Sequence, residues 1–281
     1  MKEGIDAFLK YLADSQGCSQ NTLAAYRNDL NQMAAFLGAD KADNPGGKSL
    51  TDYLFSLKDR RYSPSTVARK IASAKSFFKF MVNTGRLRSN PAKNLLSPQI
   101  SKHSPSTLSS SEWQRLLAEP TKLSTPEAKR DRVMLELLYA TGLRVSELVA
   151  LNVRNINLEQ RNLYCSQGSS RRQVPFDSRI ARLLKDFIGD ARFELLSDEK
   201  ETALFLNRLG KRLTRQGFLE IVKNYAAKAG LGGKVTPRTL RHSFAAYKLQ
   251  GGARLQDVQR LLGHAYISST KIYERRVHPV R

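Results

Sequence analysis

Two arginines stand where the sequence predicts the start of a helix. In TPRTLR, residues 236–241, a threonine suited to cap a helix precedes a proline suited to its first position. Arg238 and Arg241, three residues apart, would share one face of the opening turn. Their charge opposes the positive end of the helix dipole, so local stability does not explain them, whereas a bound anion such as phosphate would. The alternative is that Arg241 pairs with a buried carboxylate.

A third arginine, Arg144, lies at a predicted corner between two helices. The segment RDRVMLELLYAT, residues 130–141, is followed by Gly142, a residue suited to end a helix in the left-handed conformation. Arg144 then opens the next turn, with Glu147 three residues on. Such an arginine either forms a structural ion pair with Glu147 or acts in catalysis while Glu147 holds it in place.

A histidine and a tyrosine follow near the C-terminus. His264 comes directly after Gly263, which ends a predicted helix, and Tyr273 lies nine residues later on a short amphipathic segment. Each of these residues, taken alone, is more often structural than functional. Their order behind the three arginines, in a strongly basic chain, is what indicates a functional set.

The composition points to a polyanionic partner. The chain has 281 residues, with 47 Lys and Arg against 25 Asp and Glu, which gives a formal net charge of +22. A surface of this charge favours nucleic acid. The two cysteines, Cys18 and Cys165, have no spacing typical of a metal site and fit a reducing cytoplasm. No stretch reads as a membrane span or a signal peptide, so we expect a cytoplasmic protein without a metal or cofactor.

The length and the hydrophobic pattern predict two mainly helical domains. Residues 1–87 repeat apolar side chains at helical spacing, and residues 88–107 carry three prolines among Ser and Lys, as exposed linkers do. Residues 108–281 form the second domain, in which NLYCSQGSSRRQVPF, residues 162–176, predicts a β-hairpin or small antiparallel sheet. Later helices are expected at Ser178–Ile188, Arg215–Ala229, Pro237–Gln250, Leu255–Leu262 and Ser269–Arg276.

Four ordered motifs resemble the tyrosine recombinase, or phage integrase, family. They are ATGLRVSEL at 140–148, TLRHSFA at 239–245, LLGH at 261–264 and STKIY at 269–273. Upstream, residues 18–37 and 63–81 are similar to the core-binding helices of Xer-type members. The resemblance therefore covers nearly the whole chain.

The resemblance implies a fold and a reaction. The fold would be a C-shaped clamp on duplex DNA, with a helical core-binding domain (1–87) and a mainly helical catalytic domain (108–281) that holds a small sheet. Tyr273 would attack the scissile phosphate and form a 3′-phosphotyrosyl link, while Arg144, Arg241 and His264 bind the same phosphate. The reaction would need no metal, ATP or cofactor. The protein would act on double-stranded DNA as a homo-oligomer, from dimer to tetramer, with or without a partner recombinase.

Three features depart from the family pattern. The family carries a lysine in the hairpin turn that protonates the leaving oxygen, whereas Gln167 takes that position here and cannot give up a proton. Arg238 stands where the family usually has His or Lys, and an arginine can hold phosphate but cannot act as a base. Only eight residues follow Tyr273, which predicts a weaker or different contact between protomers.

These departures leave two readings open within the family, beside a third in which the chain is a helical nucleic-acid-binding protein of unrelated function, which would explain neither the arginine spacing nor Tyr273. The first is a site-specific recombinase of the Xer or integrase type, and the second is a catalytically impaired DNA-binding protein of the same family. Both predict salt-sensitive binding to DNA through basic side chains outside the catalytic set. The candidates for these phosphate contacts, each with the alternative of a merely solvated side chain, are Lys70, Lys75, Lys79, Arg171 and Arg172.

Overall fold

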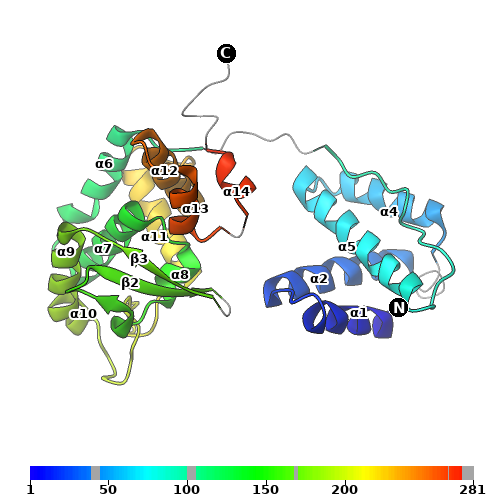
Figure 1. Cartoon of the computed structure of the whole chain (residues 1–281), viewed down its shortest axis with the longest axis horizontal. Helices are drawn as coiled ribbons and strands as arrows, with labels where there is room; N and C mark the ends of the chain where they lie inside the picture. Colours follow the sequence, from blue (N-terminus) through cyan, green and yellow to red (C-terminus); the bar gives the residue numbers. More distant parts are fainter. Residues whose placement is uncertain (39–44, 100–105, 168–169, 265, 274–281) are drawn as a thin grey trace, which may run out of the picture. The chain divides into compact units, whose positions relative to one another are not determined.

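The computed structural model describes residues 1–38, 45–99, 106–167, 170–264 and 266–273 (Figure 1). Within these residues the protein is mainly helical with one small antiparallel sheet, which confirms the expected fold class. The chain divides into two compact units, residues 1–102 and 103–281. None of the described helices is long and apolar enough to cross a membrane.

Unit 1 is a bundle of helices around a core of aliphatic and aromatic side chains. Its helices are α1 (Lys2–Asp14), α2 (Gln20–Leu37), α4 (Gly47–Asp59) and α5 (Pro64–Asn83). The hydroxyls of Ser19 and Ser63 cap α2 and α5, because each accepts from a backbone N–H group in the first turn of its helix. Ala92 and Leu95 also belong to this core, so the first part of the stretch expected to be linker packs on unit 1.

Unit 2 is built around α7 (Pro126–Thr141), which contacts α6, α9, α10 and α12 and contributes buried leucines to the core. The order of its helices is α6 (Ser110–Ala118), α7, α8 (Val145–Ala150), α9 (Ser178–Gly189), α10 (Ala191–Glu194), α11 (Arg215–Lys228), α12 (Pro237–Gln250), α13 (Leu255–Leu262) and α14 (Ser268–Lys271). Two short 3₁₀ turns lie at Pro120–Lys122 and Val153–Asn155. The later helices agree with the sequence prediction except at the end, where α14 stops at Lys271 and Tyr273 lies in the turn that follows.

The expected small sheet is confirmed as three antiparallel strands, β1 (Ile156–Asn157), β2 (Asn162–Gln167) and β3 (Ser170–Pro175), in that order. Leu163 pairs with Val174, and both side chains are fully buried in the core of unit 2. Cys165 pairs with Arg172 two residues further along β2. Because side chains alternate along a strand, this register turns Arg172 toward the same side as the buried Val174.

Candidate active site

Arg144 and Glu147 form the corner between α7 and α8. Gly142 ends α7 in the left-handed conformation, with a φ of 61°. A Cβ atom on this residue would lie 2.2 Å from the Phe244 ring, so only glycine fits here. The backbone N–H of Arg144 donates to Glu147 Oε2 at 2.7 Å, and its Nη1 donates to Oε1 at 3.0 Å. Glu147 therefore caps α8 through one carboxylate oxygen and orients the Arg144 side chain through the other. The ion pair between the two residues is thus also the contact that holds the arginine in position.

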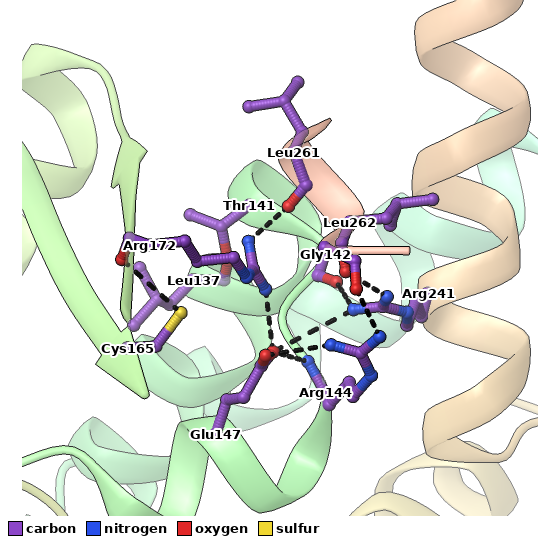
Figure 2. A network of polar contacts seen from close by, with 11 residues as sticks. Leu137, Thr141, Gly142, Arg144, Glu147, Cys165, Arg172, Arg241, Leu261 and Leu262 are labelled. Carbon is purple, nitrogen blue, oxygen red and sulfur yellow. Dashed lines mark hydrogen bonds and ion pairs between the residues drawn. The ribbon is translucent and has the colours of Figure 1, made fainter. Parts of the chain in front are cut away.

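Glu147 serves more than one arginine. Its side chain is only 3% exposed, and Arg172 Nη2 lies 2.8 Å and Arg241 Nη1 4.0 Å from its Oε2. Burial alone would raise its pKa, but the N–H of Arg144 and the Arg172 guanidinium outweigh this and hold the pKa below its ordinary value. One carboxylate thus faces three guanidiniums, and the cluster keeps an excess of positive charge (Figure 2).

Arg241 comes from the second turn of α12 and reaches two backbone carbonyls. Its Nη1 donates to Gly142 O at 2.7 Å, and its Nη2 donates to Leu262 O at 2.5 Å. These carbonyls, rather than the carboxylate 4.0 Å away, are its closest partners. Burial, followed by the charge of Arg144, lowers the pKa of Arg241 to about 10. The guanidinium is still charged at neutral pH, in a place that an anion would stabilise.

Arg144, Arg172 and Arg241 all donate to backbone carbonyls at the C-terminal end of α13 (Figure 2). Arg172 donates to Leu261 O, Arg241 to Leu262 O and Arg144 to Gly263 O, the last at 2.8 Å. Carbonyls at a helix C-terminus carry negative partial charge and suit cations. The contacts fix the position of residues 261–263, and therefore of His264, against the arginines.

His264 is held as a neutral side chain. Gly263 ends α13 in the left-handed conformation, and the His264 N–H donates to Gln259 O at 3.1 Å. Its Nδ1 lies 2.9 Å from the Oγ1 of Thr270, which is fully buried. Burial and then the charges of Arg241 and Arg144 lower the pKa of His264 to about 4. At neutral pH it can therefore supply a hydrogen bond but no charge.

Tyr273 is buried beside this cluster. Its side chain, 2% exposed, packs in a small apolar group with Phe244 and Ala245 of α12 and Val258 and Leu262 of α13. Leu262 thus shares this apolar group with the tyrosine and accepts from Arg241 through its carbonyl. Burial raises the pKa of the phenol, opposed by the charges of Arg241 and Arg238.

The tyrosine hydroxyl has a partner that the sequence analysis missed. His242 Nδ1 lies 2.6 Å from Tyr273 Oη, and the exposed Arg238 donates from Nε to His242 Nε2 at 3.0 Å. Arg238 and His242 are four residues apart on α12 and so lie on one helix face. That spacing from an arginine already singled out, inside the TLRHSFA motif, was the signal that could have found His242.

Comparisons with known proteins identify the family of the chain. The model of the phage integrase family matches residues 106–278, and the model of the phage integrase N-terminal SAM-like domain matches residues 5–85. The chain belongs to the phage integrase family.

Within the family, the chain is similar to Xer-type tyrosine recombinases. It is 44% identical to "Tyrosine recombinase XerC" of Roseiflexus sp. (strain RS-1), over 97% of this chain and 89% of that relative. It is 39% identical to "Tyrosine recombinase XerD" of Oceanobacillus iheyensis, over 97% of this chain and 93% of that relative. The fold is similar to that of the XerH recombinase in a post-cleavage complex with palindromic difH substrate, with a TM-score of 0.75, 23% identity, and 98% and 92% of the two chains covered.

The structure brings together most of the residues that the family motifs singled out. Arg144, Arg241, His264 and Tyr273 gather around residues 261–264, as the motifs imply. Gln167 and Arg171 lie at the facing ends of β2 and β3, but their side chains are outside the described part of the structure, so their assignments stay predictions.

Two of the expected DNA contacts need correction. Arg172 does not project from the hairpin to the surface, because its guanidinium donates to Glu147 and to Leu261 O within the arginine cluster of the candidate site. Lys70 is also inside the protein, where its Nζ lies 3.0 Å from Asp29 Oδ1 and 2.7 Å from Gln32 Oε1, with the side chain 2% exposed. On the same helix Lys75 is half-buried and Lys79 is exposed, so both stay candidates.

Proposed function

We propose that the protein is a site-specific DNA recombinase that cleaves and rejoins duplex DNA through a 3′-phosphotyrosyl intermediate at Tyr273. One observation carries this proposal above the others. In the segment Leu262–His264, the first two carbonyls accept from Arg241 and Arg144, and Leu262 belongs to the same apolar group as Tyr273. The segment ends in His264, so the nucleophile and the phosphate-binding groups share one support.

The first step is an exchange of one phosphate ester for another. Tyr273 Oη forms a bond to the phosphorus while the bond from phosphorus to the 5′-oxygen breaks, and the 5′-oxygen leaves as a hydroxyl after taking a proton. The negative charge that grows on the non-bridging oxygens would be stabilised by Arg144 and Arg241, whose positions are fixed beforehand. Neutral His264 would donate a hydrogen bond to the same phosphate.

Rejoining reverses this step. A 5′-hydroxyl from the partner strand attacks the phosphotyrosine, and the released tyrosine recovers its proton. The energy of the broken bond is kept in the covalent intermediate, so strand exchange consumes no nucleotide triphosphate. The chemistry needs positioned charge and a nucleophile, and the described site offers both.

Protonation of the leaving oxygen is the weak point of this chain. Gln167 stands at the position of the family lysine and has no proton to give. Arg171, four residues later in the sequence, is a poor proton donor because a guanidinium holds its proton too strongly. A water molecule or another lysine would have to serve. We therefore expect cleavage to be slow, with leaving-group departure limiting the rate.

Assembly on DNA follows from the same reading. Exchange of strands between two duplexes requires several protomers, and a neighbour of similar fold was solved as "a lambda integrase(75-356) dimer bound to a COC' core site". We propose a homo-oligomer, dimer to tetramer, on double-stranded DNA, with a partner recombinase as an alternative. A cytoplasmic location follows, because that is where the DNA substrate of such an enzyme lies.

The proposal is tested by trapping the covalent intermediate. The protein is incubated with nicked duplexes that carry candidate sites, and the products are separated on a denaturing gel. A DNA–protein adduct that disappears with Tyr273→Phe is expected, and Gln167→Lys or a 5′-sulfur leaving group should increase its rate of formation. If the protein binds the duplexes tightly but forms an adduct with none of them, including the sulfur substrate, the result would instead favour the catalytically impaired DNA-binding protein.

A further inference from the structure

Three side chains form a hydrogen-bonded row that ends on the nucleophile. Arg238 Nε donates to His242 Nε2 at 3.0 Å, and His242 Nδ1 lies 2.6 Å from Tyr273 Oη, with the two rings 5.3 Å apart between centroids. The row begins at an exposed arginine and ends at a tyrosine that is 2% exposed. His242 thus links the surface of the site to its buried reacting atom.

Arg238 determines which imidazole nitrogen carries the proton. A guanidinium has only N–H donors, so the nitrogen that faces it, Nε2, must be an acceptor and carry no hydrogen. The ring proton of His242 is then on Nδ1, the nitrogen next to Tyr273 Oη. In this tautomer Nδ1–H donates to the tyrosine oxygen and cannot accept its proton.

We propose that His242 is a catalytic residue that stabilises the Tyr273 phenolate by donating Nδ1–H to Oη, and that Arg238 is a positioning residue that holds the imidazole in this tautomer. The inference deepens the proposed function and rests on it. In the cleavage step the phenol proton passes to water, the Nδ1–H bond to Oη shortens as negative charge gathers there, and Oη then attacks the phosphorus. His242 keeps its proton throughout.

This role answers a difficulty that the site creates. Burial makes ionisation of Tyr273 harder, and the groups that face it within the described residues are Arg238, Arg241 and His242 from α12. His264 is neutral at pH 7, because burial and the charges of Arg241 and Arg144 lower its pKa. A hydrogen bond given directly to the phenolate is the shortest contact available to offset the burial.

The role also explains the departure at Arg238. An arginine cannot take a proton from the tyrosine, because its guanidinium has only N–H donors. By donating to Nε2 of His242, four residues later, it instead keeps the imidazole proton off that nitrogen. Arg238 therefore acts on the nucleophile through His242 rather than as a base of its own.

The tautomer can be measured without DNA or activity. The full chain, labelled with ¹⁵N-histidine, holds four histidines, and the His242 signals are assigned from their loss in His242→Asn. Long-range ¹H–¹⁵N spectra at pH 7.5 should show the proton on Nδ1, and Arg238→Ala should shift the ring toward the Nε2–H form. A proton on Nε2 in the wild type would overturn the proposal.

The catalytic role is measured by the rate of adduct formation on the nicked duplex across pH. A hydrogen bond to a charged oxygen is worth enough that His242→Ala should slow the reaction about 10- to 100-fold and move the rising alkaline limb up by roughly 1 to 2 pH units. His242→Asn places an amide N–H near the position of Nδ1 and should recover at least about tenfold of that loss. A base could not be replaced by this amide, so an equally slow His242→Asn would overturn the proposal.

Arg238 is tested by the same profile. Arg238→Ala should shift the alkaline limb in the same direction, and Arg238→Lys, again a pure donor, should restore it. Binding of the uncleaved duplex and thermal unfolding are measured for every variant, because a folding or binding defect would lower the rate without moving the limb. A Tyr273-dependent adduct that His242→Ala leaves unchanged would refute only the role of His242, whereas no adduct from the wild type would refute the proposed function and this role together.

Discussion

At the scale of single residues, the site is arranged around unbalanced positive charge. Glu147 is the carboxylate that Arg144, Arg172 and Arg241 share, and the neighbouring His264 is kept neutral by burial and by these charges. The pKa of Arg241 is lowered to about 10 because its charge is buried near that of Arg144. The guanidiniums of this cluster repel one another, because they have only one carboxylate between them. A phosphodiester bound beside them relieves this repulsion, which favours binding of the substrate.

The first prediction follows from the ionisation of Glu147. Its pKa is held below the ordinary 4.5 in the folded protein, so its ionised form stabilises the fold at every pH above that value and loses this effect as the pH falls through the lowered folded pKa. Glu147→Gln should cost roughly 3 kcal/mol of unfolding free energy at pH 7, because it leaves three guanidiniums without their carboxylate. The gap to the wild type should narrow below pH 4.5, as measured by urea unfolding. A gap that stayed constant down to pH 3 would contradict it.

At the scale of helices and strands, local sequence determined much of what the structure shows. Caps such as Thr236 and Ser63, and the glycine that ends α7, act within one turn of the chain, so their effect can be predicted from neighbouring residues. The contacts that complete the site are not local. Arg144 reaches Gly263, 119 residues away, and Arg172 reaches Leu261, 89 residues away, and no periodicity encodes such distances.

The same limit explains the sequence predictions that were wrong. Lys70 lies between apolar positions of α5, where a lysine is usually solvated, but its partner Asp29 belongs to another helix and is itself buried. The sequence alone predicts Arg172 on the hairpin surface. The register that turns it inward depends on the pairing of β3 with β2, which the local sequence does not reveal. His242 was missed because its role depends on where the chain brings Tyr273, 31 residues later.

The second prediction concerns the helix end that places Arg144. Gly142 has a φ of 61°, and a Cβ there would lie 2.2 Å from the Phe244 ring, whereas a Cβ at Gly252, which has a φ of 85°, would meet no described atom within 4 Å. Both Gly→Ala changes force a side chain into the left-handed region at about 1–2 kcal/mol. Gly142→Ala should cost a further ~1–3 kcal/mol from the clash.

The measurement compares the unfolding free energies of the two variants and the rate of adduct formation. Gly252→Ala serves as the matched control for backbone strain, and it should leave the rate near that of the wild type. Gly142→Ala should also slow cleavage, because the corner carries both Arg144 and the carbonyl that Arg241 binds. Equal losses of stability in the two variants would show that Phe244 gives way without cost.

At the scale of the whole molecule, the excess charge of +22 must be divided between cations that bind DNA and cations that hold the fold. Lys70 and Lys79 lie nine residues apart on one helix and fall on opposite sides of this division. Lys70 is buried on Asp29 and Gln32, and Lys79 is exposed. A tally of charges cannot separate them, but their burial does.

The last prediction tests this division through the dependence of DNA affinity on salt. Each phosphate contact releases counterions, so log affinity falls with log salt by about 0.9 for each contact. Lys79→Ala should weaken binding and flatten this slope by about 1, with no change in unfolding free energy. Lys70→Met should leave the slope unchanged and destabilise unit 1 by roughly 1–3 kcal/mol, since Arg69 still pairs with Asp29 when Lys70 is removed. The slope is measured by fluorescence anisotropy on a labelled duplex, and a flatter slope in Lys70→Met would mean that this lysine leaves Asp29 to bind a phosphate when DNA is present.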